Sequence, residues 1–466
     1  MPDVGVEHGG SPKPASVPSD YQSFRSRPDL LPPRVTVSVH SHDASAGDIF
    51  LAPYSGPGQY GPMILDEDGR TLWFKPLPPG TRAADFRPIE YEGKRLLSWW
   101  QDPLVSGGQS NAGIVLADSS YRVVKVIRAG NGYHPDLHEF QITPEGTALI
   151  TVYSGLRCNL ASIGGPSDGA VADTQVQELD PKTGLVMYEW HSLDHVPLTD
   201  SYVSARPGSL ASPFDYFHIN SVDKEADGDL LIDSRNTWAA YDVDPGSGKV
   251  LWQLGGKHGS FKLGAGTVTA YQHDARRQPN GNITFFDNGA TPAVHPQSRA
   301  IEISLSGSHG STRLVRRAEH TPSLVSGSQG NLQALANGDW MVGWGQEPYL
   351  TEFAPDGRVL FDAHLPSTYE SYRVFRAAWS AQPGGRPRIA VAGARVYVSW
   401  NGATEVASWR VLAGPSEAAF TPVAMASKRG FETAIALPAS VKSGLVEVQA
   451  LSGGGAVLST SASAPA

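Results

Sequence analysis

The sequence is poor in cysteine and in charge, and it has no long hydrophobic run. Cys158 is its one cysteine among 466 residues, which excludes an intrachain disulfide and any metal site built from several cysteines. Charged residues make up 18% of the chain, below the roughly 25% of an average soluble domain. No stretch of about 18 uncharged apolar residues occurs, so we expect no transmembrane helix.

The chain also lacks an excess of positive charge and an N-terminal leader. It carries 37 Lys and Arg against 46 Asp and Glu, a net charge of −9. This disfavours a nucleic-acid partner, which would need a basic face on the protein. The N-terminal segment contains no apolar run of the signal-peptide type. We therefore expect a cytoplasmic protein, or a secreted or periplasmic one whose leader has been removed.

Glycine, proline and aromatic residues are what the chain has in quantity. It has 50 glycines and 36 prolines, more than the roughly 12% that the two supply in average proteins. Hydrophobic residues make up 40%, with 11 Trp, 16 Tyr and 15 Phe. So many turn-forming residues disfavour a helical protein, while the hydrophobic content suffices for a large core.

A two-part repeat runs through most of the chain. One part is an acidic or glycine turn followed by a short apolar run; its six copies begin at Leu65, Leu116, Leu179, Tyr241, Ile303 and Phe353. The other part is a strand, a glycine turn and a second strand, with turns at Gly93, Gly146, Gly228, Gly281 and Gly338. Two β-hairpins in roughly 50 residues match the period of a propeller blade. We predict an all-β fold, a six-bladed β-propeller with four strands in each blade.

The repeat departs from its regular form at the ring closure and in one blade. Residues 47–55 read as a second strand without a first, and residues 371–379 as a first strand without a second. Pairing these two segments would leave the ring without open edges. The third repeat carries two insertions, Ser154–Ala170 and His191–Asp215, which we interpret as lids or binding loops.

The sequence predicts three regions. Residues 1–28 are rich in Pro, Ser and Gly and poor in hydrophobic residues, which is typical of a flexible tail. The propeller is predicted over residues 29–385. Short alternating strands over residues 386–466 resemble a small fibronectin-type-III-like β-sandwich, with Trp400 as a core candidate.

Three histidines occupy equivalent places in consecutive blades. Counting back from the turn glycines places His138, His218 and His273 near the start of the innermost strand, at one rim of the central channel. The second strand in the blade of His218 returns to this rim and ends at Arg235. We predict that three imidazoles and a guanidinium converge there.

This set of side chains suits the transfer of a sulfuryl or phosphoryl group. Arginine and imidazole bind a tetrahedral oxyanion, and imidazole is a nucleophile that is partly neutral at pH 7. Three imidazoles are also a catalytic zinc pattern, but the arginine argues against a metal, and we expect none. Histidines that serve only as core groups are the alternative. Trp100 and Trp238 are placed to meet an aromatic substrate, with core packing as the alternative for each.

Long ordered phrases in the middle of the chain resemble one known family. They lie at residues 215–256, 271–289 and 298–303, and they include DYFHINS, LIDSRNTW and YQHDARR. They resemble the arylsulfotransferase family, and the resemblance extends from about Tyr21 to the SWNGAT segment at residues 399–404. It implies a six-bladed propeller that moves a sulfuryl group from an aryl sulfate to a phenol, without a nucleotide donor or cofactor. The family's exported members carry a disulfide, so this chain resembles a divergent branch with an added sandwich.

The resemblance also implies roles for single residues. The family's motifs match His138-Glu139, His218-Ile219-Asn220, Ser234-Arg235 and Gln272-His273. By this match His273 is the nucleophile that becomes sulfated. The sulfuryl oxygens would be held by His138, His218 and Arg235, and His218 would move the proton of the phenol. We predict that the substrates are bound by Asn220 and Gln272, which lie in these motifs, and by Trp238 and Trp100, which their places in the blades suggest.

Two other functions stay open. The same fold and pocket would also suit acid–base chemistry without sulfuryl transfer, such as cyclisation of a phenolic metabolite. A non-catalytic binding propeller, with the sandwich as its attachment module, is the second alternative. The identities of donor and acceptor, the oligomeric state, the role of the sandwich and the presence of a metal in the channel are also left open.

Overall fold

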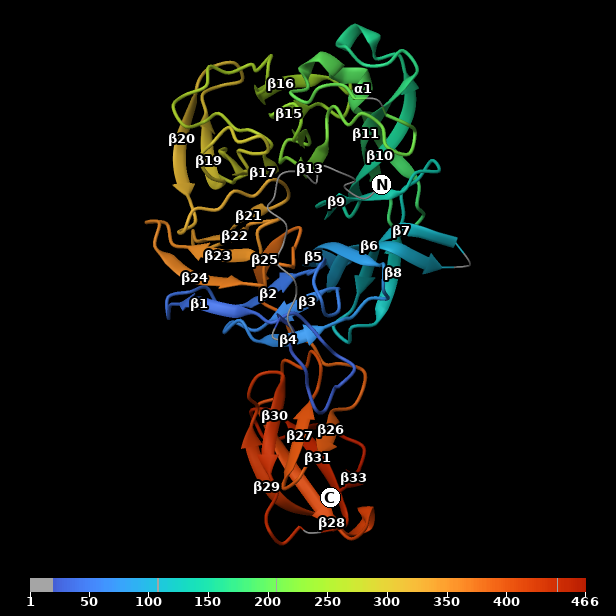
Figure 1. Cartoon of the computed structure of the whole chain (residues 1–466), viewed down its shortest axis with the longest axis vertical. Coiled ribbons are helices and arrows are strands. Elements are labelled where there is room, and N and C mark those ends of the chain that lie inside the picture. The colour runs from blue at the N-terminus through green and yellow to red at the C-terminus, as the bar shows by residue number, and fades with distance from the viewer. Residues whose placement is uncertain (1–19, 107–108, 207, 442) are drawn as a thin grey trace.

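The protein is almost entirely β in the computed structural model, which describes residues 20–106, 109–206, 208–441 and 443–466. Six sheets form a ring, and two further sheets lie beside one edge of it as a separate body (Figure 1). This confirms the predicted all-β propeller. Among the described residues, no helix has the length and hydropathy needed to cross a membrane.

Each blade contains four antiparallel strands, the first of which lies at the channel, and one blade carries an additional outer strand. Blade 1 consists of β25 (Val374–Ala377), β2 (Asp48–Leu51), β3 (Met63–Leu65) and β4 (Thr71–Phe74). Blade 2 consists of β5 (Arg82–Tyr91), β6 (Lys94–Ser106), β7 (Gln109–Ala117) and β8 (Val123–Ile127). Blade 3 consists of β9 (Pro135–Ile142), β10 (Ala148–Cys158), β11 (Gly169–Leu179) and β12 (Val186–His191).

The other three blades continue the ring in chain order. Blade 4 consists of β13 (Ile219–Lys224), β14 (Leu230–Ser234), β15 (Ala239–Val243) and β16 (Val250–Gly255). Blade 5 consists of β17 (His273–Arg277), β18 (Ile283–Asp287), β19 (Arg299–Leu305) and β20 (Thr312–Ala318). Blade 6 consists of β21 (Asn331–Ala334), β22 (Trp340–Gly343), β23 (Tyr349–Phe353) and β24 (Val359–His364), with β1 (Thr36–His40) added at its outer edge.

The ring closes in blade 1, where the two ends of the propeller meet. β2 and β25 pair antiparallel, with Asp48 opposite Ala377 and Leu51 opposite Val374. This confirms the predicted pairing of residues 47–55 with 371–379. The outer pairing of β1 with β24 was not predicted, because β1 lies outside the repeat and pairs with a strand from a distant part of the chain.

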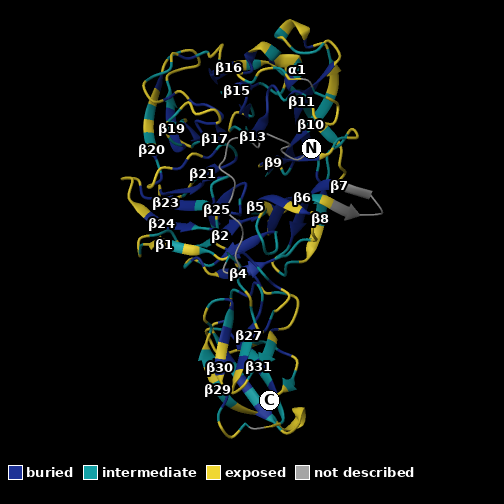
Figure 2. Cartoon of the chain, viewed as in Figure 1, coloured by how far each residue is buried: buried dark blue, intermediate teal, exposed yellow. Residues whose placement is uncertain are grey.

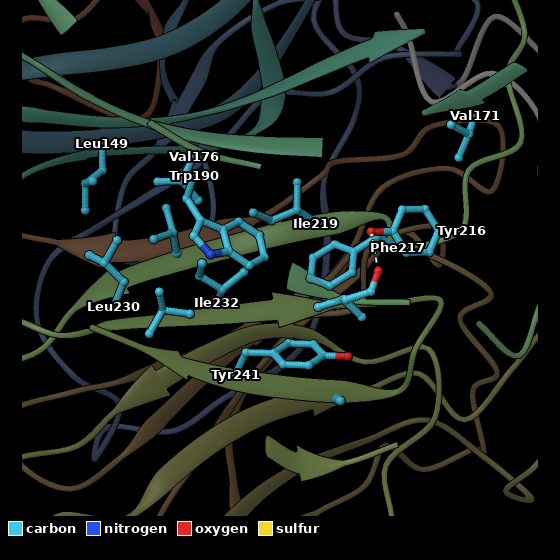
Figure 3. Close-up of a cluster of buried hydrophobic side chains, with 14 of the residues drawn as sticks. Leu149, Val171, Val176, Trp190, Tyr216, Phe217, Ile219, Leu230, Ile232 and Tyr241 are labelled. Atoms are coloured by element: carbon cyan, nitrogen blue, oxygen red, sulfur yellow. Dashed lines mark hydrogen bonds between the residues drawn. The ribbon is translucent and has the colours of Figure 1, made fainter. Parts of the chain in front are cut away.

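Hydrophobic side chains fill the spaces between neighbouring blades. Between blades 3 and 4 they include Trp190, Phe217, Ile219 and Tyr241, all of which are buried (Figure 3). Burial of one such side chain stabilises the fold by roughly 1.5–3 kcal/mol. The burial pattern in Figure 2 accordingly shows dark inner strands and more exposed outer strands. Packing between blades thus holds the channel-lining strands in a fixed ring.

The first predicted insertion is largely regular structure. β10 and β11 pair without interruption from Ala148 opposite Leu179 to Cys158 opposite Gly169. The loop predicted over Ser154–Ala170 is therefore mostly a long hairpin that extends beyond the blade. The second insertion, His191–Asp215, contains a helical turn, α1 (Ser192–His195), and a short 3-10 turn, Leu198–Asp200. It packs against blade 4, where the backbone N–H of Tyr202 donates to the carbonyl of Asn236 over 2.8 Å.

The C-terminal body is a two-sheet sandwich. One sheet contains β26 (Arg388–Val391), β27 (Arg395–Ser399) and β30 (Glu432–Ala436). The other contains β29 (Thr421–Ser427), β28 (Ser408–Gly414), β31 (Leu445–Leu451) and β32 (Val457–Thr460), with β33 (Ala464–Pro465) paired to β31. Trp400 belongs to the core between them, as predicted. The fibronectin-type-III-like assignment and the boundary at residue 386 remain predictions.

The segment before the propeller differs from the predicted tail. Residues 1–19 of the predicted tail over 1–28 lie outside the described residues. In the remainder, Ser26 is buried and its hydroxyl lies 2.8 Å from that of Ser399. The rings of Phe24 and Phe431 lie 4.2 Å apart. This part of the chain therefore packs onto the sandwich.

Candidate active site

The three predicted histidines lie together at one end of the channel. His138 is in β9, His218 directly precedes β13, and His273 begins β17. The ring centroids of His138 and His218 are 4.9 Å apart, and those of His218 and His273 are 6.5 Å apart. All three are buried. Three consecutive blades thus bring an imidazole to the same end of the channel.

Two of the histidines are backed by carboxylates that sequence reasoning missed. Nδ1 of His138 contacts Oδ1 of Asp136, and Nδ1 of His218 contacts Oδ2 of Asp215. Burial acts to raise the pKa of Asp136, but the charge and hydrogen bonds of His138 outweigh it and lower this pKa. A carboxylate at Nδ1 orients the ring and makes Nε2 the atom that exchanges a proton. The signal was an aspartate two or three residues before each histidine.

His273 has a different environment, which holds it in the neutral form. Its Nδ1 donates to Oδ1 of Asn288 over 2.7 Å, and its Nε2 accepts the backbone N–H of Gln329 over 3.2 Å. Burial and the charges of Arg235 and His218 lower the pKa of His273 well below its ordinary value. The lone pair is therefore on Nε2, where it accepts the N–H of Gln329, so Nε2 acts as a nucleophile only when this hydrogen bond opens.

Asn288 fixes the tautomer of His273. Its amide nitrogen donates to the carbonyls of Ser326 and Gln329, each over 3.0 Å. Its oxygen is therefore turned to the ring of His273 and can only accept. This forces the proton onto Nδ1 and keeps it there.

Arg235 lies beside His273 at the end of β14. It is buried, and its guanidinium donates to the carbonyl of Gly327 over 3.0 Å and to the side chain of Asn236 over 2.8 Å. The same guanidinium lies 4.8 Å from the ring centroid of Tyr271. Arg235 is thus held in place by several contacts, with its positive charge near the neutral imidazole.

Asn220 and Gln272 link blades 4 and 5. The amide nitrogen of Asn220 donates to the carbonyl of Gln272 over 2.8 Å, and its oxygen accepts the N–H of Asp274 over 3.2 Å. Gln272 donates to Asp233 over 2.8 Å and to the carbonyl of Ser234 over 3.0 Å. Both side chains are fully buried. This geometry favours a positioning role over the predicted contact with substrate.

The two predicted tryptophans have different surroundings. Trp100 is buried between blades 2 and 3, and its Nε1 donates to the carbonyl of Pro135 over 2.8 Å. It therefore supports the strand of His138 from inside the core. Trp238 is half-buried; it stacks on Tyr202 at 3.7 Å and meets Tyr271 edge-on at 5.1 Å. Trp238 thus forms part of an aromatic wall beside Arg235.

A layer of charged side chains, most of them buried, lies next to the histidines in the channel. It comprises Asp85, Arg87, Glu139, Asp274, Arg276 and Arg373. Arg373, which directly precedes β25, pairs with Glu139 at 3.2 Å and with Asp85 at 3.1 Å. Burial acts to raise the pKa of Glu139, but the three arginines outweigh it and lower the pKa to about 2. These ion pairs tie together strands from four blades.

The described residues contain no group of three or more His, Cys, Asp or Glu side chains arranged to hold a metal ion. The histidines instead use Nδ1 for Asp136, Asp215 and Asn288. The arrangement as found combines a neutral imidazole, two carboxylate-backed imidazoles and a fixed guanidinium. Chemically, it can bind an oxyanion, offer a nucleophile and exchange protons.

The fold and this site together define a six-bladed propeller with a histidine–arginine cluster at one end of its channel. The chain belongs to the arylsulfotransferase (ASST) family, whose model matches residues 87–365. That span includes all four predicted catalytic residues. Membership implies small-molecule aryl substrates. No curated protein matches the chain.

Solved structures resemble the chain only distantly. A protein of unknown function from Bacteroides caccae is 15% identical, with a TM-score of 0.43, and the match covers 71% of this chain and 98% of that one. An inactive variant of virginiamycin B lyase from Staphylococcus aureus is 11% identical, with a TM-score of 0.35 and coverage of 79% and 97%. At these scores neither similarity bears on function.

Proposed function

We propose that the protein is an aryl sulfotransferase that works through a covalent sulfohistidine at His273. The observation that carries the proposal is the state of this side chain. It is neutral, with its proton held on Nδ1 by Asn288 and its lone pair on Nε2. A buried, neutral imidazole beside a fixed guanidinium is suited to attack an anionic sulfate ester.

In the first half-reaction, Nε2 of His273 gives up its hydrogen bond from the N–H of Gln329 and attacks the sulfur of the aryl sulfate. The N–S bond forms while the bond from sulfur to the aryl oxygen breaks, and the aryl oxide leaves. Arg235 stabilises the charge on the sulfuryl oxygens, and protonated His218 gives its Nε2 proton to the leaving oxygen. The Nδ1 proton of His273 stays in its hydrogen bond to Asn288, so the modified ring carries a positive charge that balances the sulfonate.

In the second half-reaction, a phenol takes the place of the first product. Neutral His218, oriented by Asp215, accepts the phenolic proton as the oxygen attacks sulfur. The S–N bond breaks and His273 returns to its neutral form. His138, oriented by Asp136, lies beside His218 and helps to hold the sulfuryl oxygens.

The aromatic wall supports an aryl substrate at this end of the channel. Tyr271, Trp238 and Tyr202 form a continuous series of ring contacts that starts at Arg235. Nε1 of Trp238 is buried and has no hydrogen-bond partner among the described residues. A phenol or aryl sulfate ring packed on this wall would supply both stacking area and an oxygen near that donor.

The test is intact-mass analysis after mixing the protein with p-nitrophenyl sulfate and no acceptor. We expect the gain of one sulfuryl group (~80 Da) with a stoichiometric burst of nitrophenol. His273→Ala should lose both signals. His309→Ala is the matched control, because His309 is exposed and bonds only to its neighbour Ser308. A folded wild-type protein that shows neither signal with a panel of aryl sulfates would refute the proposal.

The two carboxylate-backed histidines favour a second candidate. Asp136–His138 and Asp215–His218 are acid–base pairs that could act on a phenolic metabolite without any sulfuryl group. Such an enzyme would turn over with no mass gain on the protein. Its activity would be lost in His218→Ala and largely kept in His273→Ala, the reverse of the order expected for sulfuryl transfer.

A further inference from the structure

Asp233 is a buried carboxyl group that joins the two strands carrying Arg235 and His273. It lies in β14, two residues before Arg235, and its side chain is fully buried. Its Oδ1 accepts a hydrogen bond of 2.8 Å from Nε2 of Gln272, the residue that directly precedes His273. Nε2 of Gln272 also donates to the carbonyl of Ser234 over 3.0 Å. One pair of side chains thus sets the spacing between the nucleophile and the guanidinium.

Each member of this pair has an atom that no other described residue satisfies. Among the described residues, Oδ2 of Asp233 and Oε1 of Gln272 are buried and have no hydrogen-bond partner. Two unsatisfied acceptors in one buried pair are costly, at about 1–3 kcal/mol each. A proton on Asp233 converts one carboxyl oxygen from an acceptor into a donor. The pair then has a donor for each acceptor. An amide and a protonated carboxyl group match each other in this way, whereas an amide and a carboxylate leave an acceptor over.

The surroundings of Asp233 favour the neutral carboxyl group. Burial is the largest influence on its pKa, and Asp274 raises it further. Gln272, Asn220 and Arg276 act in the opposite direction, and the balance raises the pKa to about 8. Across the sheet, β13 places Ser221 opposite Asp233 and β15 places Ala240 there. No cation of the described residues forms an ion pair with this carboxyl group, which sets it apart from Glu139.

We propose that Asp233 is a positioning residue that holds Gln272, and through it His273, by means of a carboxyl group that keeps its proton. The inference rests on the proposed function only for its catalytic consequence. Loss of the proton would place a buried carboxylate beside an unsatisfied Gln272. The strand of His273 would then shift relative to Arg235, and the attack geometry would be lost.

The first test compares the pH dependence of His273 sulfation in the wild type and in Asp233→Asn. Asparagine reproduces the shape and hydrogen bonding of the neutral acid, and it does not titrate. The wild-type labelling rate with p-nitrophenyl sulfate should fall by about tenfold per pH unit above the carboxyl pKa. The Asp233→Asn rate should match the wild type at pH 7 and show no such fall. Identical pH profiles for the two proteins would overturn the proposal.

Two further variants keep this test decisive. Gln272→Met removes the hydrogen bonds to Asp233 while keeping the volume, so labelling should be slow at every pH, without the alkaline fall. Asp242→Asn is the matched control, because burial also raises the pKa of Asp242, to about 7, yet it faces Glu225 and Asp229. It should leave the pH profile unchanged. An altered profile in this control would show that any buried acid of blade 4 has the effect, and would also overturn the proposal.

A second measurement does not depend on catalysis. In protein labelled with ¹⁵N-histidine, the His273 ring signals, assigned with His273→Ala, should shift near pH 8 in the wild type and not in Asp233→Asn. If no aryl sulfate labels the wild type at any pH but this shift is present, the proposed function fails and the positioning role stands. If the ring signals behave alike in both proteins, the positioning role fails whatever the labelling shows.

Discussion

The channel contains two layers of polar side chains, one of histidines and one of paired charges. Residues of the two layers are adjacent in the sequence. His138 is followed by Glu139, and His273 by Asp274. The histidines are each oriented at Nδ1 by a single acceptor side chain. The acids are surrounded by arginines, and Glu139 alone contacts Arg87, Arg276 and Arg373. The histidine layer holds groups that can react, whereas the charges of the other layer are neutralised by ion pairs within it.

Irregular strands allow both layers to face the channel. Consecutive residues of a regular strand point to opposite faces of the sheet. β17 instead advances three residues, from His273 to Arg276, while β18 advances two, from Phe286 to Thr284. Asp274 lies in this bulge with a φ of 60°. Such a left-handed conformation is unfavourable for a residue with a side chain, so the surrounding contacts must hold it in place.

The charged layer is structural support for the histidine layer. Its ion pairs connect blades 1, 2, 3 and 5 through Arg373, Asp85, Glu139 and Asp274. Because Glu139 and Asp274 directly follow His138 and His273, their pairing fixes the backbone from which these two histidines project. Disruption of the charged layer should therefore cost stability, whereas disruption of the histidine layer should cost activity.

The largest effect on stability is expected for Glu139→Gln. The change removes a buried negative charge and leaves three arginines with one partner fewer. Breaking a buried ion pair on one side costs about 3–5 kcal/mol, so the free energy of unfolding in urea should fall by that amount. His138→Gln, one residue away, should cost much less. Equal losses in the two variants would contradict the division between the layers.

Arg235→Ala should cost a comparable free energy, but as lost stabilisation of the transition state rather than of the fold. Removal of a fixed donor from a developing oxyanion lowers a rate by roughly 10²–10³-fold. The rate of His273 labelling in the folded protein should fall by this factor, while the free energy of unfolding in urea should fall by less than in Glu139→Gln. Arg317→Ala, at an exposed position on β20, is the control. A large loss of stability with unchanged labelling would show that Arg235 belongs functionally to the structural layer.

Glu139 of the charged layer should become protonated at a lower pH than most surface carboxyl groups. The folded pKa of Glu139 is lowered to about 2, against an ordinary value of about 4.3 in the unfolded chain. Its contribution to stability is therefore present above pH 4.3 and is lost as the pH falls towards 2. Thermal unfolding from pH 5 to pH 2.5 should show a smaller decline in Glu139→Gln than in the wild type. Parallel declines would contradict this role.

The fold followed from the sequence because the repeat is local. Turn glycines such as Gly146 and Gly281 have positive φ values of 83° and 84°, which glycine adopts at little cost. The closure of β2 on β25 followed from counting unpaired strands. The hairpin beyond Ser154 did not, because its polar, glycine-containing sequence lacks the alternation that marks a strand. Its strands are fixed by pairing with each other.

The histidine cluster was predictable because blade symmetry places equivalent residues together. The same argument was available for Asn288, which follows β18 as Arg235 follows β14. Arg373 was beyond such reasoning, since its pairing with Glu139 joins residues from distant parts of the chain. Trp100 was predicted to meet substrate, but its indole lies in the core between blades, as many aromatic residues of this repeat do.

The smallest effect is expected at the aromatic wall, for Tyr202→Ala. Tyr202 is 38% exposed and stacks on Trp238 at the outer end of the wall, on the insertion that covers blade 4. Loss of one aromatic pair is worth about 0.5–1.5 kcal/mol, so KM for an aryl substrate should rise by about two- to tenfold while kcat stays within twofold. Tyr397→Ala, an aromatic residue of the sandwich, is the control. A fall in kcat without a change in KM would contradict this binding role and show that Tyr202 contributes to the chemical step, as the histidine layer does.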